Sequence, residues 1–210
     1  MIKDLTPQNA LIFRIVHRDN VPWILRNGLH CRSSRAVDPN FVQIGNLDLI
    51  AARQRHPFSN GTLSDYIPFY FTPFSPMFYS IFTGYKGIQK RSNEEIVILE
   101  SSLHILQKQG VDFVFTDRHA YLKAAQCLKD LARLDQIDWS ILQRRDFQRD
   151  PEDPGKVERY EAEALVHKHL PVGALRSIIC YADSVAWPLA AEVKKLGLKV
   201  PVTTNRDWYF

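Results

Sequence analysis

Two carboxylates separated by a single residue lie late in the chain, in the segment Arg159 to Val166 (RYEAEALV). Glu161 and Glu163 would share one face of a strand but would diverge on a helix. The stretch from Lys156 to Glu163 is made of good helix formers, whereas the residues after it are better strand material. The segment therefore has two interpretations: a solvated, charged stretch, or a catalytic carboxylate reached through a long polar loop.

Aromatic residues crowd the segment Pro68 to Tyr79 (PFYFTPFSPMFY). Such a density of rings is typical of a hydrophobic core. The alternative is the wall of a pocket that sandwiches a flat ring, with Ser75 supplying a hydroxyl group.

His17 and Arg53 are further candidates, although each has a simple structural explanation. His17 ends a predicted strand, and Arg53 closes a predicted helix, where its charge would suit the negative end of the helix dipole. What distinguishes these signals is their order along the chain: a histidine at a strand end, a tyrosine in an aromatic strand followed by a serine, then a late glutamate.

Other catalytic signatures are absent from the sequence. It contains no GxGxxG, GxxxxGK[ST], HExxH or GxSxG motif, which argues against a Rossmann dehydrogenase, a nucleoside triphosphatase, a zinc protease and a serine hydrolase. The three cysteines, Cys31, Cys127 and Cys180, are far apart in sequence, so we expect neither a disulfide framework nor a metal site.

The composition is that of a globular protein, with 45% hydrophobic and 24% charged residues. A length of 210 residues predicts one domain spanning residues 1–210. The formal charge of +4 (27 basic minus 23 acidic residues) permits a polyanionic partner without requiring one. The N-terminus is charged and broken by Pro7, and no apolar stretch approaches the ~20 residues of a membrane span. We therefore expect a cytoplasmic protein without a membrane segment.

The hydrophobic pattern predicts interspersed helices and strands without a regular βαβ rhythm, which indicates an α+β fold. Pro68 favours an edge position for the aromatic strand. The predicted strands cover residues 11–17, 66–71, 96–99, 111–115, 176–181 and 199–203. The predicted helices begin at or after Asn20, Asn46, Ser75, Leu103, Ala120 and Asp183, and those from Ala120 and Asp183 extend to Arg133 and Gly197.

The order of histidine, tyrosine and glutamate resembles that of ADP-ribosyltransferases of the diphtheria-toxin and poly-ADP-ribose polymerase type. More specifically, the chain resembles the DarT family of bacterial DNA ADP-ribosyltransferase toxins. The similar segments cover nearly the whole chain in family order: ALIFRIVHRDNVPWILRNGLHC, IGNLDLIAARQRHP, YIPFYFTPFSPM, NEEIVIL, FVFTDRHAY, QIDWSILQRRDF and RYEAEALV.

This resemblance implies a split central β-sheet with an NAD-binding cleft. It also implies transfer of ADP-ribose from NAD onto a base of single-stranded DNA, most often thymidine, with guanine modified by some relatives. The stretch from Val37 to Arg55 would fold over the NAD. The residues implied in holding NAD are Ile15, Val16, His17, Arg53, Tyr70 and Ser75.

Glu163 matches the catalytic glutamate of the family, and Arg53 matches an arginine described there as the proton acceptor. Because a guanidinium group stays protonated in proteins, we expect Arg53 to act instead as a fixed positive charge that stabilises the deprotonated imide. Glu163 would then take the proton. Glu161 is the competing choice for this role. The family usually has glutamine two residues before its catalytic glutamate, so Glu161 departs from the pattern; if Glu163 is catalytic, Glu161 would orient the acceptor base.

The segment from Asp135 to Tyr160 resembles the substrate-contacting loop of the family. Arginines together with Trp139 and Phe147 suit a single strand of DNA, although acidic residues nearly cancel their charge. The residues implied in contacting DNA are Arg144, Arg145, Arg149, Tyr160 and Glu161. The resemblance further implies a toxin–antitoxin system with a macrodomain antitoxin that removes ADP-ribose. Two other readings stay open: a single-stranded nucleic-acid binding protein without catalysis, and an NAD-dependent transferase acting on guanine, RNA or protein.

Overall fold

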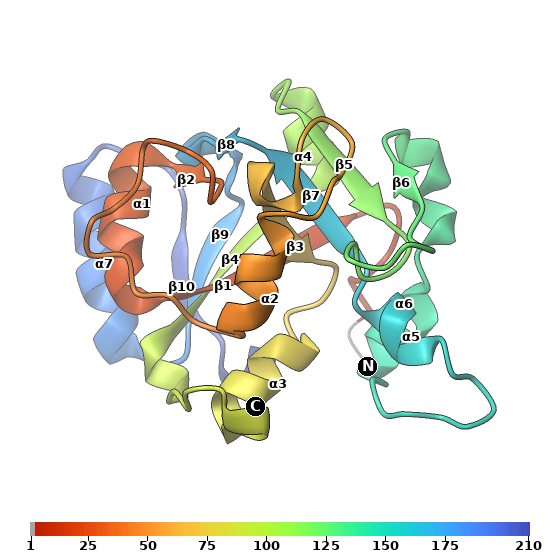
Figure 1. Ribbon diagram of the computed structural model, residues 1–210. Helices are drawn as coiled ribbons and strands as arrows, with labels where there is room; N and C mark the ends of the chain where they lie inside the picture. Colours follow the sequence, from red (N-terminus) through yellow and green to blue (C-terminus); the bar gives the residue numbers. More distant parts are fainter. Residues whose placement is uncertain (1–2) are drawn as a thin grey trace.

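An eight-stranded mixed β-sheet is the centre of the computed structural model, which describes residues 3–210 (Figure 1). Its strand order is β10-β9-β4-β1-β3-β7-β5-β6, and a separate pair of strands, β2 and β8, forms a small second sheet. The strands are β1 (Leu11–His17), β2 (Leu29–His30), β3 (Tyr66–Tyr70), β4 (Ile96–Ser102), β5 (Phe113–Thr116), β6 (Cys127–Leu128), β7 (Glu163–His167), β8 (His169–Leu170), β9 (Ser177–Cys180) and β10 (Val202–Thr204).

Seven α-helices of the described chain surround the sheet, with α1 and α7 packed against each other near its β10 end (Figure 1). Within residues 3–210, none of these helices has the length and apolar character that a membrane crossing requires. The helices are α1 (Val21–Asn27), α2 (Leu47–Arg53), α3 (Pro76–Thr83), α4 (Leu103–Lys108), α5 (Trp139–Arg144), α6 (Lys156–Tyr160) and α7 (Asp183–Lys195).

The sheet is split between β1 and β3. Strand β1 pairs with β4 along its whole length, but it pairs with β3 only at Phe13 and Tyr70. Strand β3 pairs in turn with β7 along its whole length. The expected α+β fold with a split central sheet is therefore confirmed.

Pro68 lies in β3, which is an interior strand of the sheet, so the edge position predicted for it is wrong. The split between β1 and β3 explains how the strand tolerates a proline. The carbonyl oxygen of Pro68 accepts a hydrogen bond from Nη1 of Arg14 (2.8 Å) across the split. In an antiparallel strand the N–H and C=O groups of one residue point to the same side. The N–H that proline lacks would therefore point into the split. No carbonyl group of a neighbouring strand loses a hydrogen bond there, because β1 does not pair with β3 at this position.

Several helix boundaries follow local signals that the sequence contains. The side chain of Asn46 accepts a hydrogen bond from the backbone N–H of Leu49 at the start of α2 (3.0 Å). Helix α1 ends at Gly28, which has a φ of 77°. A Cβ atom at Gly28 would also collide with the carbonyl oxygen of Leu170, so only glycine fits there.

The helix predicted over 120–133 is wrong. The chain forms tight turns up to Gln126, then strand β6, then a 3₁₀-helix over Leu131–Gln136. The N–H of Gln126, which a helix would bond to the carbonyl oxygen of Leu122, donates instead to the carboxylate of Asp117. Apolar spacing alone could not anticipate this acceptor, because it lies just after β5.

Asp183 is the first residue of α7 rather than its cap. The capping position is Ala182, which supplies no side-chain hydrogen bond. The carboxylate of Asp183 instead accepts a hydrogen bond from the hydroxyl of Thr204 (2.6 Å), which joins α7 to the last strand.

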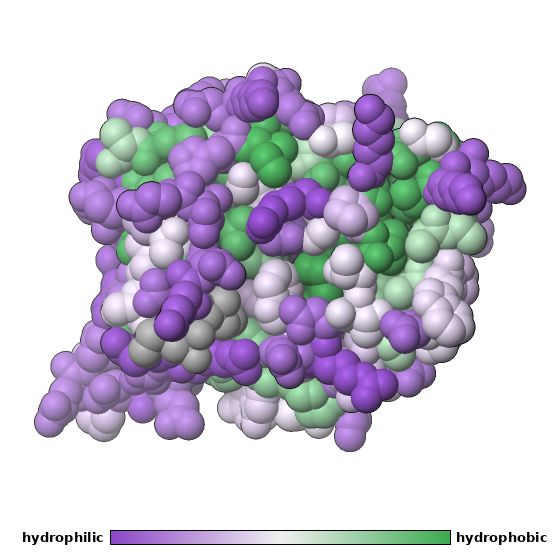
Figure 2. Space-filling model, turned by 180° about the vertical axis from the view of Figure 1, so that it is seen from behind, coloured by the Kyte–Doolittle hydropathy of each residue, from purple (hydrophilic) through white to green (hydrophobic). Residues whose placement is uncertain are grey.

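The C-terminal residues close the core beside α3 (Figure 1). The buried hydroxyl of Tyr209 lies 2.8 Å from the carbonyl oxygen of Ile179 and 3.1 Å from that of Ile96, so it bridges β9 and β4. The ring of Phe210 packs against the rings of Phe74, Phe78, Tyr79, Phe82 and Phe147. Seen from behind, the surface is mainly polar with separate apolar patches (Figure 2).

We expect Tyr209→Phe to lower the free energy of unfolding by about 1 kcal/mol, because the two buried carbonyl groups lose a shared donor. Urea denaturation of the wild type and the variant measures this difference. Tyr79→Phe is the matched control, since Tyr79 is 41% exposed and should change stability by no more than a few tenths of a kcal/mol. Equal losses in the two variants would contradict the role given to the Tyr209 hydroxyl.

Candidate active site

A buried ion pair joins two of the predicted catalytic residues. Glu163 begins β7 and has no exposed surface, and Arg53 is the last residue of α2. Nη1 and Nη2 of Arg53 donate to the two carboxylate oxygens of Glu163 at 3.1 and 2.9 Å. The backbone N–H of Ala120 donates to Oε1 of the same carboxylate (3.1 Å). The structure thus brings together residues 110 positions apart in sequence.

Neighbouring strands fix the backbone of Glu163. Its N–H donates to the hydroxyl of Thr116, the last residue of β5 (3.2 Å), and that hydroxyl donates to the carbonyl oxygen of Arg118 (2.6 Å). On the other side, Glu163 is in register with Tyr70 at the end of β3. The glutamate therefore lies where β3 and β5 end and β7 begins, one strand away from the split in the sheet.

The ion pair keeps both partners charged. Burial alone would raise the pKa of Glu163, but the charge of Arg53, the neighbouring His119 and the Ala120 N–H together hold this pKa below its ordinary value. Burial would likewise lower the pKa of Arg53, yet the Glu163 carboxylate raises it. The site therefore presents a carboxylate and a guanidinium group, which fits an electrostatic role better than proton transfer by arginine.

His119 is a site residue that the sequence reasoning missed. Its Nδ1 accepts a hydrogen bond from the N–H of Tyr121 (3.2 Å) and lies 3.7 Å from Oε1 of Glu163. Burial lowers the pKa of His119, and this outweighs the opposing effect of Glu163. The ring is therefore neutral at pH 7, with its proton on Nε2. Its position a few residues after the strand FVFT was the signal that could have drawn attention to it.

Glu161 lies beside the catalytic pair but in a different environment. It follows the last turn of α6, lines the cleft described below, and makes no hydrogen bond through its side chain within residues 3–210. Burial, the charge of Glu163 and the charge of Glu158 raise the pKa of Glu161 to about 7. The carboxyl groups of Glu161 and Glu163, which are separated by one residue, thus have pKa values shifted in opposite directions.

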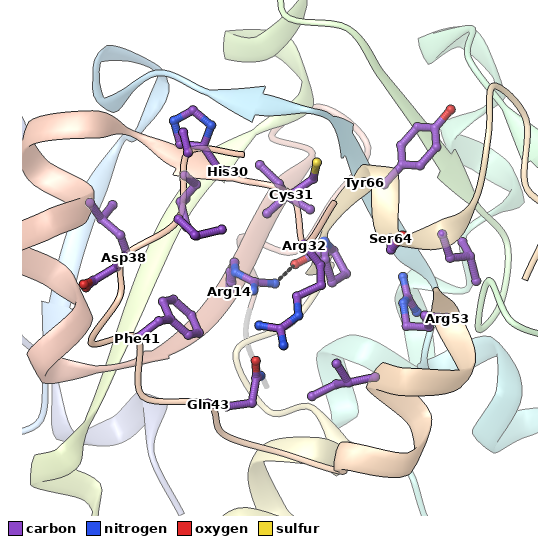
Figure 3. A pocket seen from close by; sticks show the side chains of 18 of the residues that line it. Arg14, His30, Cys31, Arg32, Asp38, Phe41, Gln43, Arg53, Ser64 and Tyr66 are labelled. Atoms are coloured by element: carbon purple, nitrogen blue, oxygen red, sulfur yellow. Dashed lines mark hydrogen bonds between the residues drawn. The ribbon is translucent and has the colours of Figure 1, made fainter. Parts of the chain in front are cut away.

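A cleft with two connected parts opens over the split in the sheet. The parts enclose about 1240 and 950 Å³ of space, their open mouths included. The larger part has Ile15, Val16, Tyr70, His119 and Glu161 in its wall. The smaller part, shown in Figure 3, lies under the segment that follows β2. Both parts share Arg14, Phe41, Gln43, Ile50, Arg53 and Pro68.

Four of the six residues predicted to hold NAD line this cleft: Ile15, Val16, Arg53 and Tyr70. His17 and Ser75 do not line it. The His17 ring is 4% exposed and lies between the carboxylates of Asp19 and Glu95 (3.5 and 3.6 Å), with its Nδ1 capping a short 3₁₀-helix.

The hydroxyl of Ser75 is used in the fold, because it accepts the N–H of Phe78 (3.1 Å) and caps α3. As predicted from the sequence, Ser75 and Pro76 start this helix.

The residues predicted to contact DNA are dispersed. Arg144 and Arg149 are exposed, and neither has an ion-pair partner in the described part of the chain. The guanidinium group of Arg145 lies 3.5 Å from the centre of the Phe74 ring and donates to the backbone of Asp207. Tyr160 is fully buried, and its hydroxyl donates to the backbone carbonyl of Phe74 (3.1 Å).

No set of three or more His, Cys, Asp or Glu side chains in residues 3–210 is placed to hold a metal ion. The chemistry available at this site consists of a buried carboxylate, a fixed guanidinium group, a neutral imidazole and a second carboxyl group that titrates near neutrality.

Comparison with known proteins identifies the family. A family model described as "ssDNA thymidine ADP-ribosyltransferase, DarT" matches residues 13–210. The chain belongs to the DarT family. A DNA ADP-ribosyl transferase of Escherichia coli O127:H6 (strain E2348/69 / EPEC) is 53% identical over 209 residues, which cover 98% of this chain and 96% of that protein.

Solved DarT structures have the same fold. DarT of Thermus sp. 2.9 in complex with ADP-ribosylated ssDNA superposes with a TM-score of 0.87 at 32% identity, over 97% of this chain and 98% of that one. The same DarT in complex with NAD+ gives a TM-score of 0.79 at 33% identity, over 97% and 99%. The expected ADP-ribosyltransferase fold and the expected class of enzyme, a DNA ADP-ribosyltransferase, are confirmed.

The raised pKa of Glu161 gives a pH dependence of stability. Between the ordinary pKa of 4.5 and the folded value of about 7, the folded chain binds one more proton than the unfolded chain, so stability falls as pH rises through this window. We expect Glu161→Gln to remove this loss and to be more stable than the wild type at pH 8 by about 2 kcal/mol, with a smaller difference at pH 5.

Urea denaturation at several pH values measures this effect. Glu152→Gln, at an exposed position of the same polar segment, is the control and should follow the wild type at every pH. A difference between wild type and Glu161→Gln that does not change with pH would show that Glu161 titrates outside this range.

Proposed function

We propose that the protein moves ADP-ribose from NAD onto N3 of thymine in single-stranded DNA and that Glu163 is the catalytic carboxylate. The observation that carries this assignment is the fully buried Glu163 carboxylate, which does not itself line the cleft but is bonded by Arg53, whose side chain lines both parts of it. Relatives described as acting on DNA and a Thermus DarT in complex with NAD+ support it. We further propose that residues 1–210 act as one catalytic domain.

NAD is the co-substrate, and the cleft fits it in shape and in chemistry. Ile15, Val16 and Tyr70 supply apolar surface and an aromatic ring in the larger part, as a nicotinamide or adenine ring requires. The segment from Val37 to Arg55 contributes residues to both parts of the cleft, in agreement with a role in covering the dinucleotide.

In the proposed reaction, Glu163 stabilises the ribose as the bond between its C1′ and the nicotinamide nitrogen breaks. The electron pair of that bond leaves with nicotinamide, and C1′ gains oxocarbenium character that a carboxylate stabilises. The electron pair of thymine N3 forms the new bond to C1′, and the N3 proton passes to Glu163. Arg53 stabilises the negative charge that develops on the imide.

Glu161 orients the acceptor base in this proposal. Its side chain is free in the wall of the cleft, next to the catalytic pair, and its carboxyl group, with a pKa of about 7, can in its protonated form donate a hydrogen bond to a carbonyl oxygen of thymine. A glutamine at this position would offer the same donor through its amide nitrogen. The exposed Arg144 and Arg149 would contact the DNA backbone nearby.

NAD and DNA are both available in the cytoplasm, where we place the activity. An enzyme that modifies the bases of its host's DNA requires restraint, and we propose a macrodomain antitoxin that removes the ADP-ribose.

We expect Glu163→Gln to reduce transfer of ADP-ribose to a thymine-containing single-stranded oligonucleotide by about 10²–10³-fold or more, because the charge beside the reacting ribose is lost. Glutamine keeps an acceptor for the Ala120 N–H, but Arg53 loses its counter-charge and stability falls, so circular dichroism must show that the variant is folded. Transfer is measured with labelled NAD, and the slow release of nicotinamide is measured without DNA. Both rates should fall in this variant.

Glu161 variants provide the matched comparison. Glu161→Gln should stay within about threefold of wild-type transfer, whereas Glu161→Ala should lose transfer by about 10-fold or more while still releasing nicotinamide. If Glu163→Gln is nearly as active as the wild type and the Glu161 variants lose both activities, Glu161 is the catalytic carboxylate. A wild type that binds oligonucleotides without any turnover would instead indicate a binding protein.

The acceptor should be an unpaired thymine. Inside a duplex, N3 is engaged in Watson–Crick pairing, and extruding the base costs a few kcal/mol. We expect a single-stranded oligonucleotide to be modified at least about 10-fold faster than the same strand in a matched duplex. An oligonucleotide containing N3-methylthymine as its only thymine should not react. Equal rates on both DNA forms, or preferred labelling of RNA, protein or guanine, would overturn this assignment.

A further inference from the structure

Arg14 is a half-buried arginine without a counter-charge. It lies in the middle of β1, beside the split in the sheet, and lines both parts of the cleft. Its Nη1 donates to the carbonyl oxygen of Pro68 (2.8 Å), drawn as a dashed line in Figure 3. Its Nε is buried and has no hydrogen-bond partner. In residues 3–210, no carboxylate forms an ion pair with Arg14.

The groups that face Arg14 do not neutralise it. Glu163 is the carboxylate whose charge influences the pKa of Arg14, but it is already paired with Arg53. Burial and then the positive charge of Arg53 lower the pKa of Arg14 to about 10, against smaller opposing effects of Tyr70 and Glu163. The group stays protonated at pH 7, so the wall of the cleft presents a positive charge that no carboxylate of the described residues pairs.

The wall of the cleft is positive beyond Arg14. In the smaller part, the guanidinium groups of Arg14, Arg32 and Arg53 surround the cavity, and Asp38 is the one acidic residue in its described lining (Figure 3). In the larger part, Arg14, Arg53 and Lys86 accompany a single carboxyl group, that of Glu161. An unpaired buried charge is costly, and a cleft of this composition favours an anion.

We propose that Arg14 binds the pyrophosphate of NAD. This inference rests on the proposed function. NAD carries its negative charges in its middle, between the neutral adenosine and the positively charged nicotinamide riboside, and Arg14 lines both parts of the cleft. Glu163 and Arg53 act at the nicotinamide ribose, which is directly bonded to the pyrophosphate. A guanidinium group that neighbours Arg53 is thus placed for that group, and its free Nε and remaining N–H groups match phosphate oxygens.

This role differs from the one expected of His17. The sequence reasoning chose the histidine at the end of the strand, but its ring is enclosed by Asp19 and Glu95. Arg14 is three positions earlier on the same strand, and its side chain reaches the cleft.

Arg14 also bonds Pro68 across the split, so the test must separate binding from folding. Arg14→Gln removes the charge but keeps an amide donor for the Pro68 carbonyl group. Arg14→Lys keeps the charge. The two variants and the wild type are titrated calorimetrically with NAD, with ADP-ribose, and with nicotinamide riboside, which lacks phosphate. A short thymine-containing single-stranded oligonucleotide is titrated separately.

We expect Arg14→Gln to weaken the binding of NAD and of ADP-ribose by about 10- to 100-fold, the range of a lost charge-assisted hydrogen bond. Arg14→Lys should lose less. Affinities for nicotinamide riboside and for the oligonucleotide should be unchanged in both variants, and circular dichroism spectra should match the wild type.

Three results would overturn the inference. NAD affinity within twofold of the wild type in Arg14→Gln would show that the charge does not serve the pyrophosphate. An equal loss for nicotinamide riboside would show that Arg14 only shapes the cleft. Loss of oligonucleotide affinity with NAD affinity intact would assign Arg14 to a DNA phosphate. If the wild type itself bound no NAD, the proposed function would fail, and that outcome is distinct from these.

Discussion

The burial of one negative charge, that of Glu163, constrains the rest of the structure. Removing a carboxylate from water costs several kcal/mol unless charge and hydrogen bonds compensate. Here a two-pronged contact with Arg53 and the Ala120 N–H supply that compensation. The three groups come from α2, from the turn after β5 and from the start of β7. Each of these elements must therefore dock in a defined place before the carboxylate can remain charged.

The open sheet follows from the same requirement. If β1 and β3 were paired along their length, the Pro68 carbonyl group would bond to the backbone of β1 instead of to Arg14, and the cleft that Arg14 and Pro68 line could not open between the strands. The single pair at Phe13 and Tyr70 keeps the two halves in register, while the bond from Arg14 to Pro68 bridges the gap beyond it. Beyond that pair, the split thus lacks backbone hydrogen bonds between β1 and β3, and the charged side chain of Arg14 occupies the space beside it.

Signals between neighbouring residues predict many of the helix boundaries. The wrong predictions come from contacts between residues that are distant in the sequence. The caps at Asn46 and Ser75 and the stop at Gly28 concern neighbouring residues, so they can be predicted from the sequence. The helix expected from Ala120 fails because the N–H of Gln126 donates to Asp117, just after β5, instead of to a carbonyl group one helical turn earlier. Glu163 and Arg53 were chosen through a family resemblance, and the structure brings them together. Arg14 was not predicted as a site residue, because a single arginine in an apolar strand is common where one face of the strand is partly exposed to solvent.

The distribution of charge bears on how DNA is held. In the polar segment before β7, Lys156 is paired with Asp146, and Arg159 is paired with Asp138 and Asp153, so these cations stabilise the loop itself. Trp139 and Tyr160 are buried as well and offer no face for stacking. Few cations remain for the phosphates, which are the groups that dominate non-specific affinity. In the proposed reaction, recognition then depends on the base that enters the cleft, and a base can enter only where it is unpaired. The few free cations of this segment fit a short single strand better than a duplex, whose binding depends on many phosphate contacts.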